Sequence, residues 1–191
     1  MNDVIKHLKK GGIIITPTDT VYGIMADATN DKAVKKVYEA KKRSFDKPLI
    51  VLVNSVEMLN DYVLEIDDIT KRIIDKYWPG PLTILFKKNN RLSKYVSNND
   101  YIGIRYPNNE IIINILNEFN KPVVSTSANI SNNEVVTEVS MIPGELLEKV
   151  DFVLDGGKLS NESSTIIKVE DGKIEILREG SLKEKIIKEF K

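Results

Sequence analysis

Small polar side chains gather in one stretch of the sequence, residues 125–129, which read Ser-Thr-Ser-Ala-Asn. Val123 and Val124 precede this stretch and are typical of the end of a buried strand. In open α/β sheets, ligands bind beyond the carboxyl ends of strands, where hydroxyl and amide groups can hydrogen-bond them. Ser and Asn also favour helix N-caps, so the stretch by itself is equally compatible with a strand that leads into a helix.

Hydroxyl groups and cations follow other apolar runs of the chain as well. Thr18 and Thr20 come after the run at residues 13–15, and Arg105 follows alternating isoleucines. Cations at the end of a helix or strand often only face solvent, but they also suit carboxylate or phosphate binding. Together these groups favour polyphosphate binding and nucleotidyl transfer, with Mg²⁺ carried by the nucleotide. The candidate residues are Thr18, Thr20, Lys41, Arg43, Arg105, Ser125, Ser127, Asn129 and Arg178.

Composition and spacing exclude several common catalytic sites. The chain has no cysteine and a single histidine, His7, which excludes thiolate nucleophiles, zinc–thiolate sites and a Ser-His-acid triad. Residues 156–158 read Gly-Gly-Lys, like the tail of a P-loop, but Phe152 stands where the first glycine of that motif belongs. We therefore expect no metal site made of protein side chains and no P-loop.

The 191 residues have a globular composition, with 41% hydrophobic and 29% charged residues. The 28 basic and 28 acidic residues balance, so overall charge favours neither nucleic acid nor membrane. The N-terminus lacks the apolar core of a signal peptide or a membrane span. We therefore expect a cytoplasmic protein with no membrane partner. Because the composition shows no break, we also expect a single domain over residues 1–191.

Apolar runs and helical stripes alternate along the chain, which predicts an α/β fold. Strands are expected at residues 13–15, 49–53, 82–86, 101–106, 123–124 and 152–154, with a hairpin of residues 164–169 and 173–177. Helices are expected at residues 4–8, 31–40, from 55, and at 66–77, 111–119, 146–147 and 182–190. Asp31 is the predicted cap of the second helix, and Trp78 is expected to pack in the core.

Motifs that follow one another along most of the chain carry a family resemblance. They are Pro17-Thr18-Asp19-Thr20-Val21-Tyr22-Gly23, Lys41-x-Arg43 with Lys47-Pro48-Leu49, Trp78-Pro79-Gly80-Pro81-Leu82-Thr83, Ile104-Arg105-Tyr106-Pro107, Ser125-Thr126-Ser127-Ala128-Asn129 and Ser164-Thr165-Ile166-Ile167. In this order they resemble the YrdC/TsaC family, the threonylcarbamoyl-AMP synthases, from Ile13 to Gly180. Longer relatives add a C-terminal domain, so the chain resembles a stand-alone YrdC-like domain. It departs at Ser44 and Ser163, where the family usually has proline, which concerns loop rigidity rather than charge.

The resemblance implies a fold and a reaction. The fold would be a twisted, mixed parallel and antiparallel sheet, flanked by helices, with a large concave cavity. The reaction would join L-threonine, bicarbonate or CO₂, and ATP into threonylcarbamoyl-AMP and pyrophosphate, with Mg²⁺ arriving on ATP. The product would pass to a tRNA threonylcarbamoyl transferase complex for the t6A modification of tRNA, and a weak contact with tRNA itself is also expected.

The resemblance also assigns roles to individual residues. Lys41 and Arg43 would be catalytic, as cations that offset the charge of the leaving pyrophosphate. The ATP-binding set would be Lys41, Arg43, Ser127, Asn129 and Arg178. The threonine-binding set would be Thr18, Thr20, Lys47, Arg105 and Ser125, with Arg105 as the fork for the carboxylate.

Two other functions compete with the synthase. One is a non-enzymatic RNA-binding or ribosome-maturation module that uses the same cavity. Against it stand the zero net charge and the single tryptophan, because RNA binding needs a basic face and stacking residues. The other is a carbamoyl-transfer domain of a larger maturation enzyme, which the absence of zinc-finger-like cysteine motifs disfavours.

Overall fold

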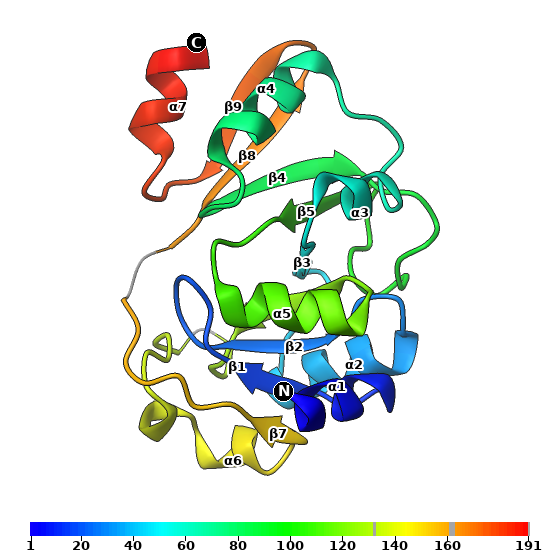
Figure 1. Cartoon of the computed structure of the whole chain (residues 1–191), viewed down its shortest axis with the longest axis vertical. Coiled ribbons are helices and arrows are strands. Elements are labelled where there is room, and N and C mark those ends of the chain that lie inside the picture. The colour runs from blue at the N-terminus through cyan, green and yellow to red at the C-terminus, as the bar shows by residue number, and fades with distance from the viewer. Residues whose placement is uncertain (132, 161–162, 191) are drawn as a thin grey trace.

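A computed structural model describes residues 1–131, 133–160 and 163–190 of the chain. Within these residues nine strands form one sheet in the order β7-β1-β2-β6-β3-β5-β4-β8-β9 (Figure 1). The strands are β1 (Ile14–Thr16), β2 (Gly23–Asp27), β3 (Ile50–Leu52), β4 (Leu82–Lys87), β5 (Tyr101–Arg105), β6 (Val123–Ser127), β7 (Phe152–Val153), β8 (Thr165–Glu170) and β9 (Lys173–Arg178). Parallel and antiparallel pairs alternate irregularly, so the predicted mixed α/β sheet is confirmed.

Helices cover the sheet at several points along the chain. They are α1 (Asn2–Lys9), α2 (Asp31–Lys41), α3 (Val56–Asn60), α4 (Asp68–Tyr77), α5 (Glu110–Phe119), α6 (Gly144–Leu147) and α7 (Lys183–Phe190), with a 3-10 turn η1 (Val139–Met141). None of the helices in the described residues is long and apolar enough to cross a membrane. Asn30 rather than Asp31 caps α2, because its side chain accepts hydrogen bonds from the amides of Lys32 and Ala33. The predicted cap was therefore one residue late.

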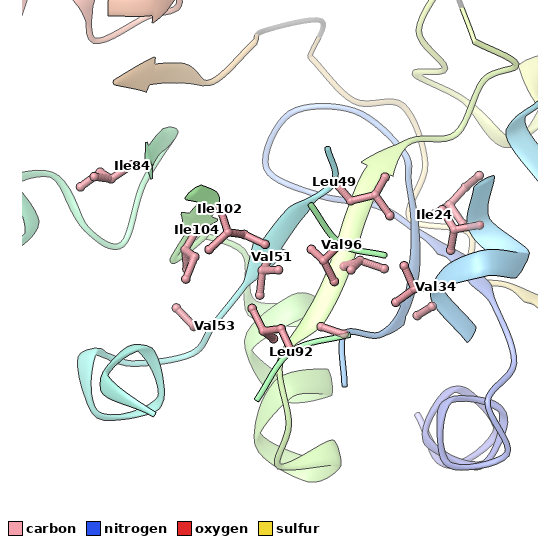
Figure 2. Packing of buried hydrophobic residues seen from close by; sticks show 14 of the residues in the cluster. Ile24, Val34, Leu49, Val51, Val53, Ile84, Leu92, Val96, Ile102 and Ile104 are labelled. Carbon is pink, nitrogen blue, oxygen red and sulfur yellow. The ribbon is translucent and has the colours of Figure 1, made fainter. Parts of the chain in front are cut away.

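Neighbouring residues of a strand face opposite sides of the sheet, and the core accordingly has two parts. Ile14 and Met25 lie in a cluster with α1 and α5. Ile13, Ile15 and Ile24 lie in the larger cluster, which extends to α2, α3, α4, α6 and α7. Figure 2 shows part of this larger cluster, from Ile24 and Val34 to Ile84. Burial of both faces explains why most of these strands are continuous apolar runs.

Strand β6 joins the two halves of the sheet. It pairs antiparallel with β2, with Gly23 opposite Ser127, and antiparallel with β3, with Ile50 opposite Ser125. Strand β3 then pairs parallel with β5, with Leu52 opposite Arg105. The register therefore brings the loop before β2, the end of β5 and the hydroxyls of β6 to one region.

The structure tests the sequence-based expectations for β2, for the end of β6 and for Trp78. Strand β2, Gly-Ile-Met-Ala-Asp, was missed because it has little β-branched or alternating character. β6 continues to Ser127 and, in the described residues, no helix starts there, so Ser127 is not a helix cap. Trp78 is 8% exposed and its Nε1 donates to the carbonyl of Leu82 at 2.7 Å, which confirms core packing.

Gly180 lies where the chain after β9 passes the start of β8. A Cβ atom at this position would lie 2.5 Å from the amide nitrogen of Thr165 and 2.6 Å from the carbonyl oxygen of Ser163. Backbone atoms cannot move aside cheaply, so we expect Gly180→Ala to lower the free energy of unfolding by about 2 kcal/mol or more in urea titrations. Gly144→Ala is the matched control, because nothing lies within 4 Å of its Cβ position, and we expect it to be nearly neutral. Equal effects of the two variants would contradict this packing.

Candidate active site

A cavity of about 340 Å³ opens at the region where β2, β3, β5 and β6 meet. Seven of the predicted site residues line it, namely Thr18, Thr20, Arg43, Arg105, Ser125, Ser127 and Arg178. Lys41, Lys47 and Asn129 do not line it. The cavity also takes in residues that the site prediction missed, including Thr126, Ser163, Ser164, Ile50 and Ile166. Ser164 and Ile166 belong to a motif already recognised in the sequence, which was the available signal.

The Thr18–Thr20 loop is fixed by its own hydroxyl groups. The Oγ1 atom of Thr18 accepts hydrogen bonds from the amides of Thr20 at 3.0 Å and Val21 at 3.2 Å, and donates to the carbonyl of Val21 at 2.7 Å. It lies 2.9 Å from the Oγ1 atom of Thr20. Both threonines are buried yet border the cavity, so the loop presents hydroxyls from a rigid support.

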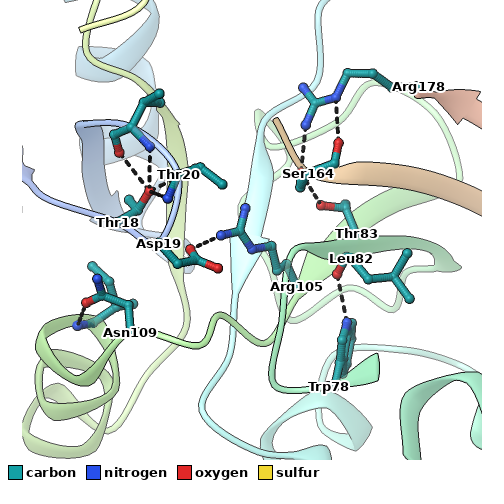
Figure 3. Close-up of polar contacts among 12 residues, drawn as sticks. Thr18, Asp19, Thr20, Trp78, Leu82, Thr83, Arg105, Asn109, Ser164 and Arg178 are labelled. Carbon is teal, nitrogen blue, oxygen red and sulfur yellow. Dashed lines mark hydrogen bonds and ion pairs between the residues drawn. The ribbon is translucent and has the colours of Figure 1, made fainter. Parts of the chain in front are cut away.

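Arg105 forms a buried ion pair with Asp19, as Figure 3 shows. The two side chains are 8% and 11% exposed. Pairing is incomplete, because Oδ2 of Asp19 and Nε of Arg105 are buried without a hydrogen-bond partner. Burial, and then the neighbouring Arg178, lower the pKa of Arg105 to about 10. Asp19 belongs to the first motif of the family resemblance, but its pairing with Arg105 was not predicted, because the two residues are 86 positions apart in the chain.

Arg178 approaches the same cavity from β9. Its Nε donates to the carbonyl of Ser164 at 3.0 Å and its Nη2 to the hydroxyl of Ser164 at 2.7 Å. That hydroxyl lies 3.3 Å from Oγ1 of Thr83 in β4. Burial lowers the pKa of Arg178. In Figure 3 this chain of contacts lies on one side of Arg105 and the Thr18–Thr20 loop on the other.

Arg43 lines the cavity from the loop after α2. Its Nε donates to the carbonyl of Lys47 at 3.0 Å, and its Nη2 donates to the carbonyl of Pro48 at 2.9 Å. Burial lowers the pKa of Arg43, and the nearby Tyr38 opposes that fall. The backbone oxygen of Lys47 thus helps to hold Arg43 in position, while Lys47 itself does not border the cavity.

Lys41 is buried and does not border the cavity, although it belongs to the same motif as Arg43. It is 1% exposed, and its Nζ donates to the carbonyl of Ser127, to the carbonyl of Asn129 at 2.6 Å and to Oδ1 of Asn129 at 3.0 Å. Burial, followed by the charge of Arg43, lowers the pKa of Lys41 to about 7. The predicted catalytic lysine is therefore packed beneath the segment that carries Ser127.

Gly156 and Gly157 serve packing instead of forming a phosphate loop. The hydroxyl of Tyr22 accepts a hydrogen bond from the amide of Gly156 at 2.9 Å and donates to the carbonyl of Gly157 at 2.7 Å. A Cβ atom on Gly156 would lie 2.6 Å from Cγ of Pro17. Neither glycine borders the cavity.

The lining of the cavity is positive and rich in hydroxyl groups. Arg43, Arg105 and Arg178 reach it, and in the described part of the chain no carboxylate borders it. Asp19 sits behind Arg105 and balances one of these charges. Such an arrangement suits a ligand with several negative charges, because guanidinium groups bind carboxylates and phosphates through paired N–H donors.

Comparison with known proteins identifies the family of the chain. The model of the Sua5/YciO/YrdC family, which carries the description telomere recombination, matches residues 6–180. The chain belongs to this family. A putative threonylcarbamoyl-AMP synthase of Methanocaldococcus jannaschii is 47% identical over 93% of this chain and 86% of its own length. The threonylcarbamoyl-AMP synthase of Pyrococcus abyssi is 31% identical over 96% of this chain. The recognition made from the motifs is confirmed.

Solved structures of the Sua5/YciO/YrdC family confirm the fold. Pyrococcus abyssi Sua5 complexed with L-threonine has a TM-score of 0.91 at 30% identity, over 97% of this chain and 56% of that one. Escherichia coli YciO has a TM-score of 0.85 at 24% identity, over 95% of this chain and 90% of that one. The chain thus spans about half the length of the Pyrococcus abyssi protein, but most of the Methanocaldococcus jannaschii relative.

The Arg105–Asp19 pair makes a testable contribution to stability. Asp19→Asn keeps the shape of the side chain but leaves the guanidinium buried without a counter-charge, so we expect the free energy of unfolding to fall by about 3 kcal/mol or more. Asp61→Asn is the matched control, because it breaks the exposed Arg91–Asp61 pair and should cost less than about 1 kcal/mol. Urea titrations of both variants measure the difference. A loss from Asp19→Asn as small as the control's would contradict a buried pair.

Proposed function

We propose that this chain is an L-threonylcarbamoyl-AMP synthase, a nucleotidyltransferase that uses L-threonine, bicarbonate or CO₂, and ATP, and releases pyrophosphate. The observation that carries the proposal is the convergence of Arg43, Arg105 and Arg178 on one hydroxyl-lined cavity. The names of the relatives support it, as does the similarity of the fold to a Sua5 structure that holds L-threonine.

The chemistry needs positioning and positive charge more than an enzyme nucleophile. The amine of threonine adds to CO₂ and loses a proton, which gives a carbamate. An oxygen of the carbamate attacks the α-phosphorus of ATP, and the bond from that phosphorus to the bridging oxygen of the β-phosphate breaks. Negative charge builds up on the departing pyrophosphate, where preorganised cations lower the barrier.

Each arginine has a role that fits its surroundings. Arg105 stands beside the Thr18–Thr20 loop and binds the carboxylate of threonine as a fork, with Thr18, Thr20 and Ser125 as hydroxyl partners. Arg43 and Arg178 bind the phosphates of ATP, and Ser127, which also lines the cavity, orients the α-phosphate that ATP shares with AMP. The remaining predicted residues, Lys41, Lys47 and Asn129, act indirectly, without bordering the cavity. Lys47 does so through its backbone carbonyl, which accepts a hydrogen bond from Arg43.

Mg²⁺ enters this proposal with ATP. The side-chain oxygens that border the cavity belong to hydroxyl groups, whereas Mg²⁺ in nucleotide sites prefers carboxylates, phosphates and water. These residues fit the substrates better than they fit a metal of the protein's own. The product would pass, in the cytoplasm, to a tRNA threonylcarbamoyl transferase complex, with at most a weak contact between this chain and tRNA. The RNA-binding alternative is not favoured.

The reaction is tested by its dependence on each substrate. ATP, L-threonine, bicarbonate and Mg²⁺ together should yield pyrophosphate and threonylcarbamoyl-AMP, measured by a coupled pyrophosphate assay and by mass spectrometry. Leaving out threonine should abolish the pyrophosphate signal, because the carbamate of threonine is the attacking group. An unchanged rate without threonine would mean that the chain hydrolyses ATP and is not this synthase.

Arg43 is tested by removal of its charge. We expect Arg43→Ala to lower the turnover rate at least about tenfold, because the guanidinium offsets charge that develops on the leaving pyrophosphate. Arg91→Ala removes an exposed arginine that pairs with Asp61, and should leave the rate unchanged. Thermal unfolding of both variants separates a catalytic loss from a folding defect. A fully active Arg43→Ala variant would refute the role.

A further inference from the structure

The two cations of the Lys41-x-Arg43 motif lie in different environments. Lys41 is the last residue of α2, and Lys42 follows in the left-handed conformation, at φ 51° and ψ 41°, which ends the helix. Arg43 leaves this turn toward the cavity, whereas Lys41 stays in the buried interior. The helix end therefore separates two charges that are only two positions apart in the sequence.

The ammonium group of Lys41 has no donor left for a ligand. An ammonium carries three N–H bonds, and here three protein oxygens accept from it. Two are the carbonyl oxygens of Ser127 and Asn129, and the third is Oδ1 of Asn129. A contact with phosphate would require Lys41 to leave these oxygens, which are buried with it, and buried carbonyls without partners are costly.

The three oxygens belong to Ser127, which borders the cavity, and to Asn129, which follows it two positions later and does not border the cavity. The hydroxyl of Ser127 donates to Oδ1 of Asn129 at 2.5 Å, and the amide of Ser131 donates to the backbone carbonyl of Lys41 at 3.1 Å. Main chain and side chain of Lys41 thus hold this segment at two points. Ser127 itself borders the cavity, and its carbonyl oxygen accepts from Lys41, which does not border the cavity.

We propose that Lys41 is a positioning residue that holds the Ser127–Ser131 segment under the nucleotide, and that Arg43 is the cation of this motif that meets the phosphates. The inference rests on the proposed function in that it takes the ligand to be a nucleotide. It divides the motif into a buried support and an anion contact that lines the cavity.

The two roles predict different changes in nucleotide binding. Loss of a support displaces Ser127 and weakens AMP and ATP by the same factor, whereas loss of a contact to the leaving phosphates weakens ATP far more than AMP. We expect Lys41→Met to raise the Kd of both nucleotides about tenfold and to leave the ratio of Kd for AMP to Kd for ATP unchanged. We expect Arg43→Met to lower this ratio about tenfold.

Calorimetric titration with AMP and with MgATP, without threonine, measures these ratios. Lys42→Met is the matched control, because Lys42 is exposed, pairs with Glu145 and should leave both affinities unchanged. A ratio that falls in Lys41→Met as it does in Arg43→Met would overturn the inference, and so would affinities that do not change at all. Arginine keeps the charge and adds donors, so partial recovery of both affinities in Lys41→Arg would support a positioning role.

If Lys41→Met fails to fold, chemical labelling of the unmodified protein distinguishes a buried Lys41 from one that contacts ATP directly. Lys41 is 1% exposed, whereas the side chain of Lys42 is 58% exposed, so an amine-acetylating reagent should label Lys42 rapidly and spare Lys41 with or without ATP. Rapid labelling of Lys41 that ATP suppresses would show a direct contact and overturn the inference. Because neither measurement uses turnover, a chain that binds ATP but makes no pyrophosphate would refute the proposed function alone, while a chain that binds no nucleotide would refute both.

Discussion

Burial of positive charge at the ends of β5, β9 and α2 is the constraint on which this site depends. An isolated cation loses much hydration energy when it is buried, so each one must find oxygens inside the protein. Arg105 has Asp19, Arg178 has Ser164, and Lys41 has the carbonyls of the segment below the cavity. These contacts fix the cations in place, which is the preorganisation that the proposed reaction requires.

The cations of this region differ in how completely their N–H donors are paired. Lys41 is satisfied by three oxygens, while Arg105 keeps an unpartnered Nε and Arg43 borders the open space. Under the proposed function, the arginines that border the cavity are the cations that an anionic ligand meets. In the same proposal Lys41, which does not border the cavity and whose donors are satisfied, supports the segment that carries Ser127.

Sheet topology explains how these residues meet. Strand β6 pairs with β2 and β3 at once, and β3 pairs with β5, so loops far apart in the sequence open onto one cavity. The last strands, β8 and β9, add Ser164 and Arg178 across β4. The Methanocaldococcus jannaschii relative is matched over most of its length and Pyrococcus abyssi Sua5 over about half, and in both cases nearly all of this chain takes part.

Much of the fold and most of the site could be predicted from local patterns and ordered motifs. The apolar runs indicated most strands, because burial on both faces leaves a clear composition signal, and the polar ends of those runs indicated Thr18, Thr20, Arg105, Ser125 and Ser127. β2 was missed because its residues have weak strand preference and it is held by its partners β1 and β6. Register and pairing depend on contacts distant in sequence, which no local pattern records.

The sequence by itself determined which residue types were available: no cysteine, one histidine, and hydroxyls and cations placed after apolar runs. Only the tertiary structure decided where each charge points. Lys41 and Arg43 look equivalent in the motif, but the helix end between them turns one into the interior and the other toward the cavity. The physical reason is that side-chain direction follows from backbone conformation and from the oxygens nearby, and the oxygens that hold Lys41 lie more than eighty residues away.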